Sequence, residues 1–315
     1  MIRKAAIVSI SGLTLTREER IVIKRGKPWG IILFKRNISS ENQLIHLITS
    51  IKKTMKDKKY PILIDEEGGK VSRLSSFLNN SHFNQKYFGD IYKQNKNVGR
   101  NLYKSYVDSL SKILTKVGIS INTSPVLDLI KKNTHDVIGN RSYSSSPVIV
   151  NELGKLCIKF FKKNKIATVI KHIPGHGGAN LDSHFRLPKV NETYVSLKKT
   201  AFKCFKNTSS FFARTAHILY TKIDKKNNAT HSSTIIKKII RNQIGFKGIL
   251  ISDDISMKAL KYDILKNSNL ALKAGCNLVL YCAGKTIETK KLLNETPYID
   301  KFTAQKTSEF YKFLS

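Results

Sequence analysis

The stretch GILISDD, residues 248–254, is a run of mainly apolar residues that ends in two adjacent carboxylates. An apolar run without alternation is typical of a parallel strand that is buried on both faces. Seven other runs have the same character: AAIVSIS (5–11), GIILF (30–34), PILID (61–65), ISINTSPVLD (119–128), ATVIKH (167–172), SFFARTAH (210–217) and NLVLYC (277–282). Eight buried strands that alternate with helices predict an α/β fold, a TIM-type (β/α)₈ barrel, in a single domain over residues 1–315.

The segments between these runs have helical periodicity and recognisable helix starts. Thr16 with Glu19 fits a capping box, and Pro147 fits the first turn of a helix. One last helix is expected from about residue 285 to 315. The alternative, an open doubly wound sheet, is disfavoured because the sequence has neither a GxGxxG turn after its first strand nor a phosphate loop of the GxxxxGK(S/T) type.

Ionisable side chains stand where the predicted strands end. The ends of the eight runs include Asp65, Asp128, Lys171, His172, His217, Asp253 and Asp254. Barrels of this type carry their active sites at the C-terminal ends of the strands. The sequence therefore predicts a functional site at that rim.

The formal net charge of +34 suggests an anionic partner such as nucleic acid. The lysines, however, are spread along the whole chain, and only 11 of the 56 basic residues are Arg, the better ligand for phosphates and base edges. We interpret the charge as mutational bias and expect no specific nucleic-acid partner.

The compartment is inferred from the apolar runs and the cysteines. No window has the roughly 18 to 20 apolar residues of a membrane span, so none is expected. The four cysteines contain no CxxC pair, which indicates neither a disulfide framework nor a zinc knuckle: Cys157, Cys204, Cys276 and Cys282. We expect a cytoplasmic protein that needs neither a metal nor a cofactor.

The segment KHIPGHGGANLDSHFRLP, residues 171–188, concentrates three of the eight histidines. His172 and His176 have the spacing of a helical zinc pair, but the proline and glycines between and after them disfavour a helix, so a metal site is not favoured and His176 is interpreted as part of the loop. Asp182 and His184 are two residues apart. In an extended chain they project to the same side, so the carboxylate could orient the imidazole as a general acid or base.

The two carboxylates of ISDD offer a second chemical group. Alternation along a strand lets only one of Asp253 and Asp254 point into the barrel mouth, and the pattern alone does not decide which. The other is interpreted as a cap near Ser256. A carboxylate nucleophile together with a separate proton donor is what retaining glycoside hydrolysis requires.

At this point the sequence resembles a known family. The motifs are ILFKRN (32–37), DEEGGKVSRL (65–74), SPVLDL (124–129), VIGNRSY (137–143), KHIPGHGGANLDSHFRLP (171–188), IGFKGI (244–249) and ISDDISM (251–257). In this order they are similar to the successive motifs of the bacterial β-N-acetylhexosaminidases of glycoside hydrolase family three. The similarity covers almost the whole chain.

The resemblance implies a role for each matching residue. Asp253 is implied as the nucleophile, His184 as the general acid/base and Asp182 as its polarising partner. Five positions are implied to hold the N-acetylglucosamine ring: Asp65, Arg73, Arg141, Lys171 and His172. Two neighbouring residues depart from the family pattern, since Lys70 stands where Arg is frequent and Glu66 where Gln is common. These departures bear on sugar affinity more than on chemistry.

The expected function is that of a monomeric, cytoplasmic exo-β-N-acetylglucosaminidase. The resemblance implies that it removes terminal N-acetylglucosamine from peptidoglycan fragments, including those with a 1,6-anhydro-N-acetylmuramic acid aglycone, with retention of configuration. One alternative is a phosphorylase, because a histidine that has given up its proton is neutral and does not repel phosphate. Another is a basic polyanion-binding protein with a decayed site, which the intact motif residues disfavour.

Overall fold

The computed structural model describes residues 2–131, 138–176 and 187–315. Its centre is a closed barrel of parallel strands in the spatial order β1-β10-β9-β7-β5-β4-β3-β2. The strands are β1 (Lys4–Val8), β2 (Pro28–Leu33), β3 (Ile62–Ile64), β4 (Ile121–Asn122), β5 (Ala167–Ile173), β7 (Phe212–Thr215), β9 (Ile249–Asp254) and β10 (Leu278–Tyr281). Each coincides with one of the eight predicted runs, so the predicted (β/α)₈ barrel is confirmed.

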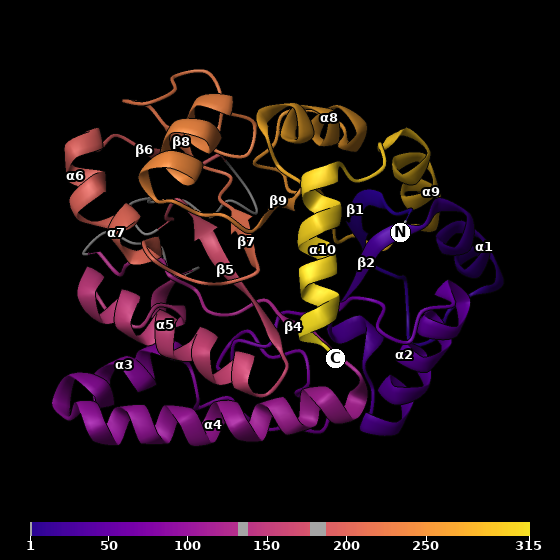
Figure 1. Cartoon of the computed structure of the whole chain (residues 1–315), viewed down its shortest axis with the longest axis horizontal. Coiled ribbons are helices and arrows are strands. Elements are labelled where there is room, and N and C mark those ends of the chain that lie inside the picture. Colours follow the sequence, from indigo (N-terminus) through magenta and orange to yellow (C-terminus); the bar gives the residue numbers. More distant parts are fainter. Residues whose placement is uncertain (1, 132–137, 177–186) are drawn as a thin grey trace.

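The helices lie around the barrel, most of them on its outside (Figure 1). They are α1 (Arg17–Gly26), η1 (Lys35–Asn37), α2 (Glu41–Met55), α3 (Gln85–Gln94), α4 (Lys96–Val117), η2 (Gly139–Arg141), α5 (Pro147–Lys163), α6 (Tyr194–Lys199), α7 (Ala201–Phe205), η3 (Ile235–Gln243), α8 (Ile264–Ala274), α9 (Thr286–Glu295) and α10 (Lys301–Phe313). A separate two-stranded parallel pair, β6 (Lys189–Val190) and β8 (Leu219–Tyr220), was not predicted. Runs of two residues are too short to give a periodic signal.

The helix starts follow the local sequence. The Thr16 side chain accepts a hydrogen bond from the backbone N–H of Glu19, and the Glu19 side chain accepts one from the backbone N–H of Thr16, which completes the predicted capping box. Pro147 occupies the first turn of α5, where a missing N–H costs nothing.

The C-terminal segment differs from the expectation of one helix over residues 285–315. It forms two helices, α9 and α10, and the break contains Pro297. Proline disfavours helical backbone at the residue before it, which explains why α9 stops at Glu295.

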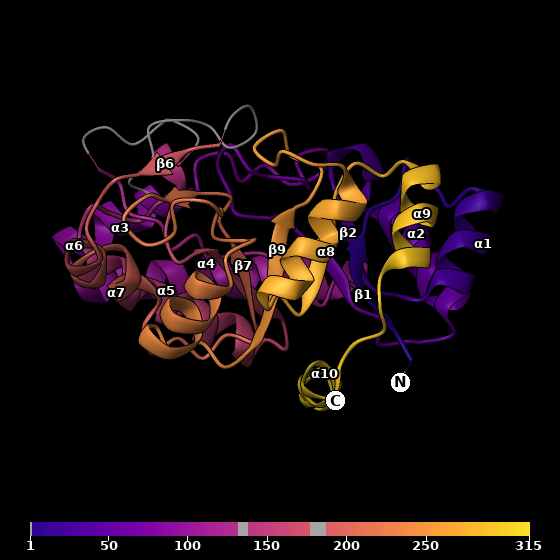
Figure 2. The same ribbon diagram turned by 90° about the horizontal axis from the view of Figure 1, so that it is seen from above.

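Helix α10 covers the end of the barrel where the strands begin. Its Phe310 is fully buried and packs against Trp29, near the start of β2, and against Phe212, the first residue of β7. The Trp29 indole N–H donates to Thr307 Oγ1 at 2.9 Å. Figure 2 shows α10 beneath the barrel. These contacts close the barrel floor and leave the opposite rim open for a site.

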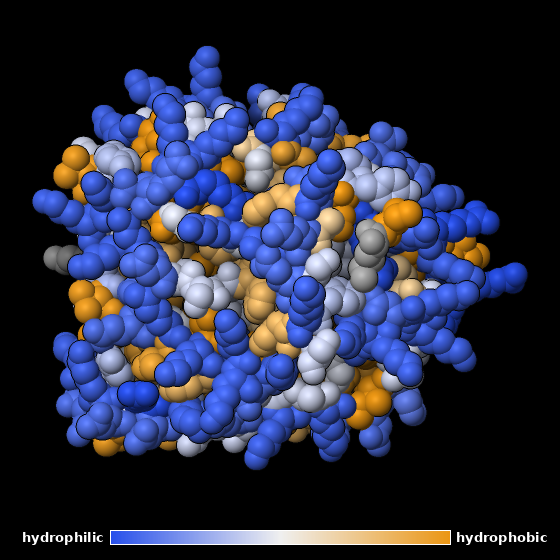
Figure 3. All heavy atoms as spheres, viewed as in Figure 1, coloured by the Kyte–Doolittle hydropathy of each residue, from blue (hydrophilic) through white to orange (hydrophobic). Residues whose placement is uncertain are grey.

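The surface is dominated by hydrophilic side chains. On the face in Figure 3 they extend over all the elements in view, with small apolar areas between them, rather than gathering on one element. Within the described ranges, none of the helices combines the length and the apolar character that a membrane crossing requires.

Candidate active site

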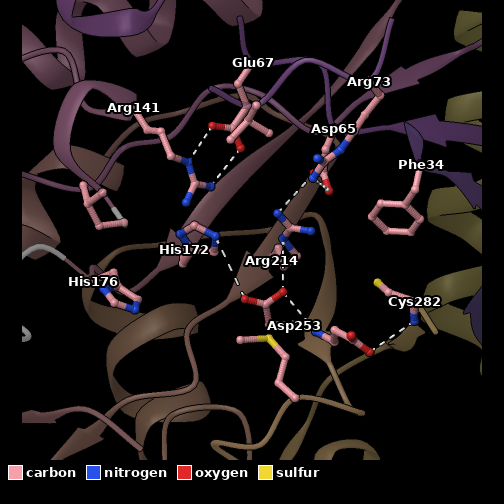
Figure 4. Close-up of a pocket in the computed structure, with 14 residues that line it drawn as sticks. Phe34, Asp65, Glu67, Arg73, Arg141, His172, His176, Arg214, Asp253 and Cys282 are labelled. Carbon is pink, nitrogen blue, oxygen red and sulfur yellow. Dashed lines mark hydrogen bonds and ion pairs between the residues drawn. The ribbon is translucent and has the colours of Figure 1, made fainter. Parts of the chain in front are cut away.

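A pocket opens at the C-terminal rim of the barrel, where the sequence predicted a site (Figure 4). Residues that end or follow β2, β3, β5, β7, β9 and β10 line it. Among them are Phe34, Asp65, Glu67, Arg214 and Asp253. The parallel strands thus bring side chains that are far apart in the sequence into one cavity.

Asp65, which follows β3, is surrounded by cations. The Nζ atom of Lys171 lies 2.9 Å from its Oδ1, and an Nη2 atom of Arg214 lies 3.2 Å from the same oxygen. Arg73 is farther away, with Nη2 3.8 Å from Oδ2. Burial acts to raise the pKa of Asp65, but these three positive charges, led by Arg214, hold it well below its usual range. Asp65 is therefore an ionised hydrogen-bond acceptor at the pocket wall.

Glu67 provides a second anionic centre two residues further on. It forms a bidentate pair with Arg141, with Nε and Nη2 at 2.8 and 2.9 Å from its two oxygens, and Lys171 Nζ lies 2.5 Å from Oε1. Burial opposes ionisation, but Arg141 and then Lys171 lower the pKa of Glu67 to about 2. Lys171 is completely buried, so it joins Asp65 to Glu67 from behind the pocket wall.

Asp128 organises the two histidines that the structure describes here. Its Oδ2 lies 2.8 Å from Nδ1 of His172, and its Oδ1 accepts the backbone N–H of His176 at 2.5 Å. His176 lies outside the helices and strands, as its interpretation as part of the loop expects, but it is only 3% exposed and also lines the pocket. Burial lowers the pKa of His176 to about 4, so this imidazole is neutral at pH 7.

The geometry separates the two adjacent carboxylates at the end of β9. Asp254 turns to the chain that follows, where its Oδ1 accepts hydrogen bonds from the N–H groups of Ser256 and Cys282. Asp253 faces the pocket, with Oδ1 3.5 Å from Nε of Arg214 and Oδ2 4.0 Å from Nε2 of His172. Burial acts to raise the pKa of Asp253, but Arg214 and His172 hold it well below its usual range.

The loop after β3 is fixed by a buried acid. Glu66 accepts the backbone N–H groups of Arg73 and Leu74 at 2.7 and 3.0 Å and the amide of Asn80 at 2.5 Å. Burial raises the pKa of Glu66. Glu66 therefore holds the loop that carries Arg73, whereas Lys70 is exposed to solvent.

The structure brings most of the predicted site residues together. Asp65, Arg73, Arg141, His172 and Asp253 line the pocket, and Lys171 lies directly behind it. Asp182 and His184 lie outside the described residues, so their positions stay predictions.

Sequence reasoning missed Arg214 and Glu67. Arg214 stands inside the apolar stretch FFART, where a buried guanidinium requires carboxylate partners, and this signal could have been used. Within the described parts of the chain, no group of three or more His, Cys, Asp or Glu residues is arranged to hold a metal ion.

Comparison with known proteins identifies the family. The glycosyl hydrolase family 3 N-terminal domain matches residues 4–301. A β-hexosaminidase of Nitrosomonas eutropha is 32% identical over 281 residues, which are 88% of this chain and 80% of that protein. A β-hexosaminidase of Neisseria meningitidis serogroup A is 31% identical over 287 residues, 89% and 78% of the two chains.

A solved structure gives the same result for the fold. The crystal structure of native NagZ from Neisseria gonorrhoeae superposes with a TM-score of 0.88 at 28% identity and covers 100% of this chain and 90% of that one. The barrel, its rim pocket and these relatives define a glycoside hydrolase of the β-N-acetylhexosaminidase class, which confirms the predicted enzyme class. The chain belongs to glycosyl hydrolase family 3.

Proposed function

We propose that the protein is a retaining exo-β-N-acetylglucosaminidase in which Asp253 is the nucleophile. The observation that carries this proposal is the state of Asp253: a buried carboxylate that faces a rim pocket and is kept ionised by neighbouring cations. Its Oδ1 accepts the N–H of Asp254 at 2.9 Å, while Oδ2 accepts no hydrogen bond from any residue that the structure describes. A free, charged oxygen suits attack on an anomeric carbon.

The reaction then proceeds in two displacements. His184 protonates the glycosidic oxygen while Oδ2 of Asp253 attacks the anomeric carbon, so the carbon–oxygen bond to the aglycone breaks and a glycosyl ester forms. His184, now neutral, takes a proton from water, which attacks the same carbon and releases Asp253. Asp182 orients His184 and stabilises its protonated form. Two inversions at one carbon give net retention.

The other pocket groups hold the sugar. Asp65 accepts hydrogen bonds from hydroxyl groups, while Arg73, Arg141 and His172 donate from the pocket wall. Lys171 acts through Asp65 and Glu67, because it is fully buried between them. A protein of the same fold from Neisseria gonorrhoeae, at 27% identity and a TM-score of 0.88, was crystallised with N-trifluoroacetyl-D-glucosamine, which supports a pocket for this class of sugar.

The natural substrates in this proposal are peptidoglycan fragments, including those with a 1,6-anhydro-N-acetylmuramic acid aglycone. The proposed enzyme is a cytoplasmic monomer that needs no specific nucleic-acid partner. Free thiols at all four cysteines fit a reducing compartment. Turnover of N-acetylglucosaminyl-anhydromuramic acid tests the substrate, and light scattering of the purified protein tests the monomer.

The decisive experiment joins a variant to product stereochemistry. Asp253→Asn should reduce turnover of 4-nitrophenyl N-acetyl-β-glucosaminide by at least about a thousandfold. NMR of the wild-type reaction should show the β-anomer of N-acetylglucosamine first. Asp263→Asn is the matched control, because Asp263 caps α8 and Asn caps a helix equally well. Wild-type turnover by Asp253→Asn, or an α-anomer formed first, would refute the proposal.

The same assay in phosphate buffer distinguishes the phosphorylase alternative. A hydrolase gives free N-acetylglucosamine at all phosphate concentrations. Accumulation of the sugar 1-phosphate would instead assign the second displacement to phosphate.

A further inference from the structure

We infer that Arg214 is a positioning residue of the reaction centre: its guanidinium joins the sugar-binding Asp65 to the nucleophile Asp253 and keeps the nucleophile ionised with one oxygen free. This inference rests on the proposed role of Asp253. It assigns a role to a residue that none of the predicted site positions includes.

The position of Arg214 follows from the strand order. β7 lies beside β9 in the barrel, and Arg214 pairs in register with Ile251, two residues before Asp253. Its side chain is 7% exposed and points along the rim, where Figure 4 shows it between Asp65 and Asp253. Nη2 lies 3.2 Å from Asp65 Oδ1 and Nε lies 3.5 Å from Asp253 Oδ1. One rigid, planar group thus spans both carboxylates.

The contact with Asp253 is an ion pair without a hydrogen bond. Nε of Arg214 is buried and has no hydrogen-bond partner among the described residues, although it lies near Asp253 Oδ1. A charge at this distance favours the ionised carboxylate but does not occupy the oxygen that attacks. A direct hydrogen bond to Oδ2 would instead reduce its nucleophilicity.

The other groups that face Asp253 contribute less than Arg214 to holding its pKa down. His172 on β5 is 4.0 Å away, and its other nitrogen is held by Asp128. His217, which follows β7, donates from Nε2 to the Asp254 carbonyl and accepts at Nδ1 from the Thr230 hydroxyl, and burial lowers its pKa, so it is neutral at pH 7. The adjacent Asp254 is a carboxyl group, not a cation. Arg214 is positively charged at every pH at which the enzyme is folded.

The second contact of Arg214 matters once the ester has formed. Esterification removes the negative charge of Asp253. If Asp253 were its only partner, the buried guanidinium of Arg214 would then have no counter-ion. Asp65 remains 3.2 Å from Arg214 and compensates that charge. Arg214 therefore needs no rearrangement between the two displacements.

The test compares Arg214→Met, Arg214→Lys and Arg241→Met by the pH profile of kcat/KM on 4-nitrophenyl N-acetyl-β-glucosaminide. Arg241 is a matched structural arginine, since it bonds the carbonyls of Phe246 and Gly248 and the side chain of Asn277, away from the pocket. Melting temperatures are measured in parallel, so that each profile is recorded where the variant is folded.

Removal of the charge raises the pKa of a carboxylate, so Arg214→Met should move the acidic limb of kcat/KM upward by about one pH unit or more. Arg214→Lys keeps the charge but cannot span both carboxylates. It should keep the limb near the wild-type position and lower kcat by about tenfold. Arg241→Met should lower the melting temperature and leave the limb in place.

The inference is overturned if Arg214→Met keeps the wild-type acidic limb and loses no more activity than Arg241→Met. If Arg214→Met does not fold, a wild-type kcat for Arg214→Lys overturns it. Failure of the proposed function is a different result: Asp253→Asn would then be active. An inactive Asp253→Asn, together with an Arg214→Met variant whose acidic limb is unshifted and whose activity loss does not exceed that of Arg241→Met, refutes only the role of Arg214.

Discussion

The His172 imidazole is held by the buried carboxylate of Asp128, with Nδ1 2.8 Å from Oδ2. Asp128 is completely buried, and the pKa of its carboxyl is lowered: burial opposes ionisation, but the charge and hydrogen bond of His172 prevail. The bond fixes which edge of the ring meets Asp128 and turns Nε2 toward the pocket. Among the residues that the structure describes, Asp128 is the only one within hydrogen-bond distance of the His172 ring, since Asp253 lies 4.0 Å from Nε2, so the orientation of the ring depends on Asp128.

Asp128→Asn should therefore weaken sugar binding. The amide keeps an oxygen for the backbone N–H of His176, but its NH₂ group cannot accept a hydrogen bond from His172. We expect kcat/KM on the aryl N-acetylglucosaminide to fall by about ten- to a hundredfold, with the loss mainly in KM. Steady-state kinetics beside the Asp263→Asn control measures this. An unchanged KM would show that the orientation of His172 does not depend on Asp128.

The acid/base role of His184 predicts a dependence on the leaving group. His184→Ala should reduce hydrolysis of substrates with poor leaving groups far more than hydrolysis of activated aryl glycosides, because only the former need a proton from the enzyme. Rates on N-acetylglucosaminyl-anhydromuramic acid and on the 4-nitrophenyl glycoside measure the difference. Equal losses on both substrates would contradict the assignment.

Gly68 has a conformation that other residues rarely adopt. Its φ is +84°, and a Cβ atom there would lie 2.2 Å from the carbonyl oxygen of Phe83. Gly68→Ala should destabilise the fold by about 1–3 kcal/mol and raise KM, because the adjacent Glu67 must move. Gly12→Ala is the control, since nothing lies within 4 Å of its Cβ position. Urea unfolding measures the free energy of unfolding of both variants. Equal values for Gly68→Ala and Gly12→Ala would argue against strain at Gly68.

The buried Glu67 pair predicts a pH dependence of stability. The pKa of Glu67 is about 2 in the folded protein against an ordinary value of 4.5, so its contribution is complete above about pH 4.5 and is lost as the pH falls toward 2. At pH 6, Glu67→Gln should be less stable than wild type by roughly 3 kcal/mol, and the difference should shrink below pH 4.5.

Urea unfolding at pH 6, 4 and 3 measures that difference. Glu309→Gln breaks a more exposed pair with Lys306 on α10 and is the control, for which little change in stability is expected at any of these pH values. The free energies of unfolding of wild type and Glu67→Gln could instead differ by a constant amount from pH 6 to 3. That result would show that the ionised form of Glu67 is not what stabilises the folded protein.

The barrel could be predicted because its strands lie in mainly apolar runs and are buried on both faces. A run such as GILISDD has few other ways to be buried, and its end then places Asp253 and Asp254 at the rim. The choice between these two acids could not be made from alternation alone. It depends on hydrogen bonds from Ser256 and Cys282, residues whose approach to Asp254 is set by the fold.

The missed residues were missed for a similar reason. Glu67 and its partner Arg141 are 74 positions apart, and the backbone N–H of the buried His176 donates to Asp128, 48 positions earlier. Such contacts arise from three-dimensional closure rather than from local periodicity. Resemblance to a family supplied roles for Asp182 and His184, which lie outside the described residues and stay predictions.

Closure of the barrel floor by α10 has a practical use. Phe310 and Thr307 fasten this helix to the end of the barrel opposite the pocket, and the last described residue, Ser315, is exposed beside it. A dye, a biotin or a solid support attached after Ser315 would therefore leave the rim facing the solution. Immobilised enzyme coupled there should hydrolyse the aryl N-acetylglucosaminide as fast as the dissolved protein does.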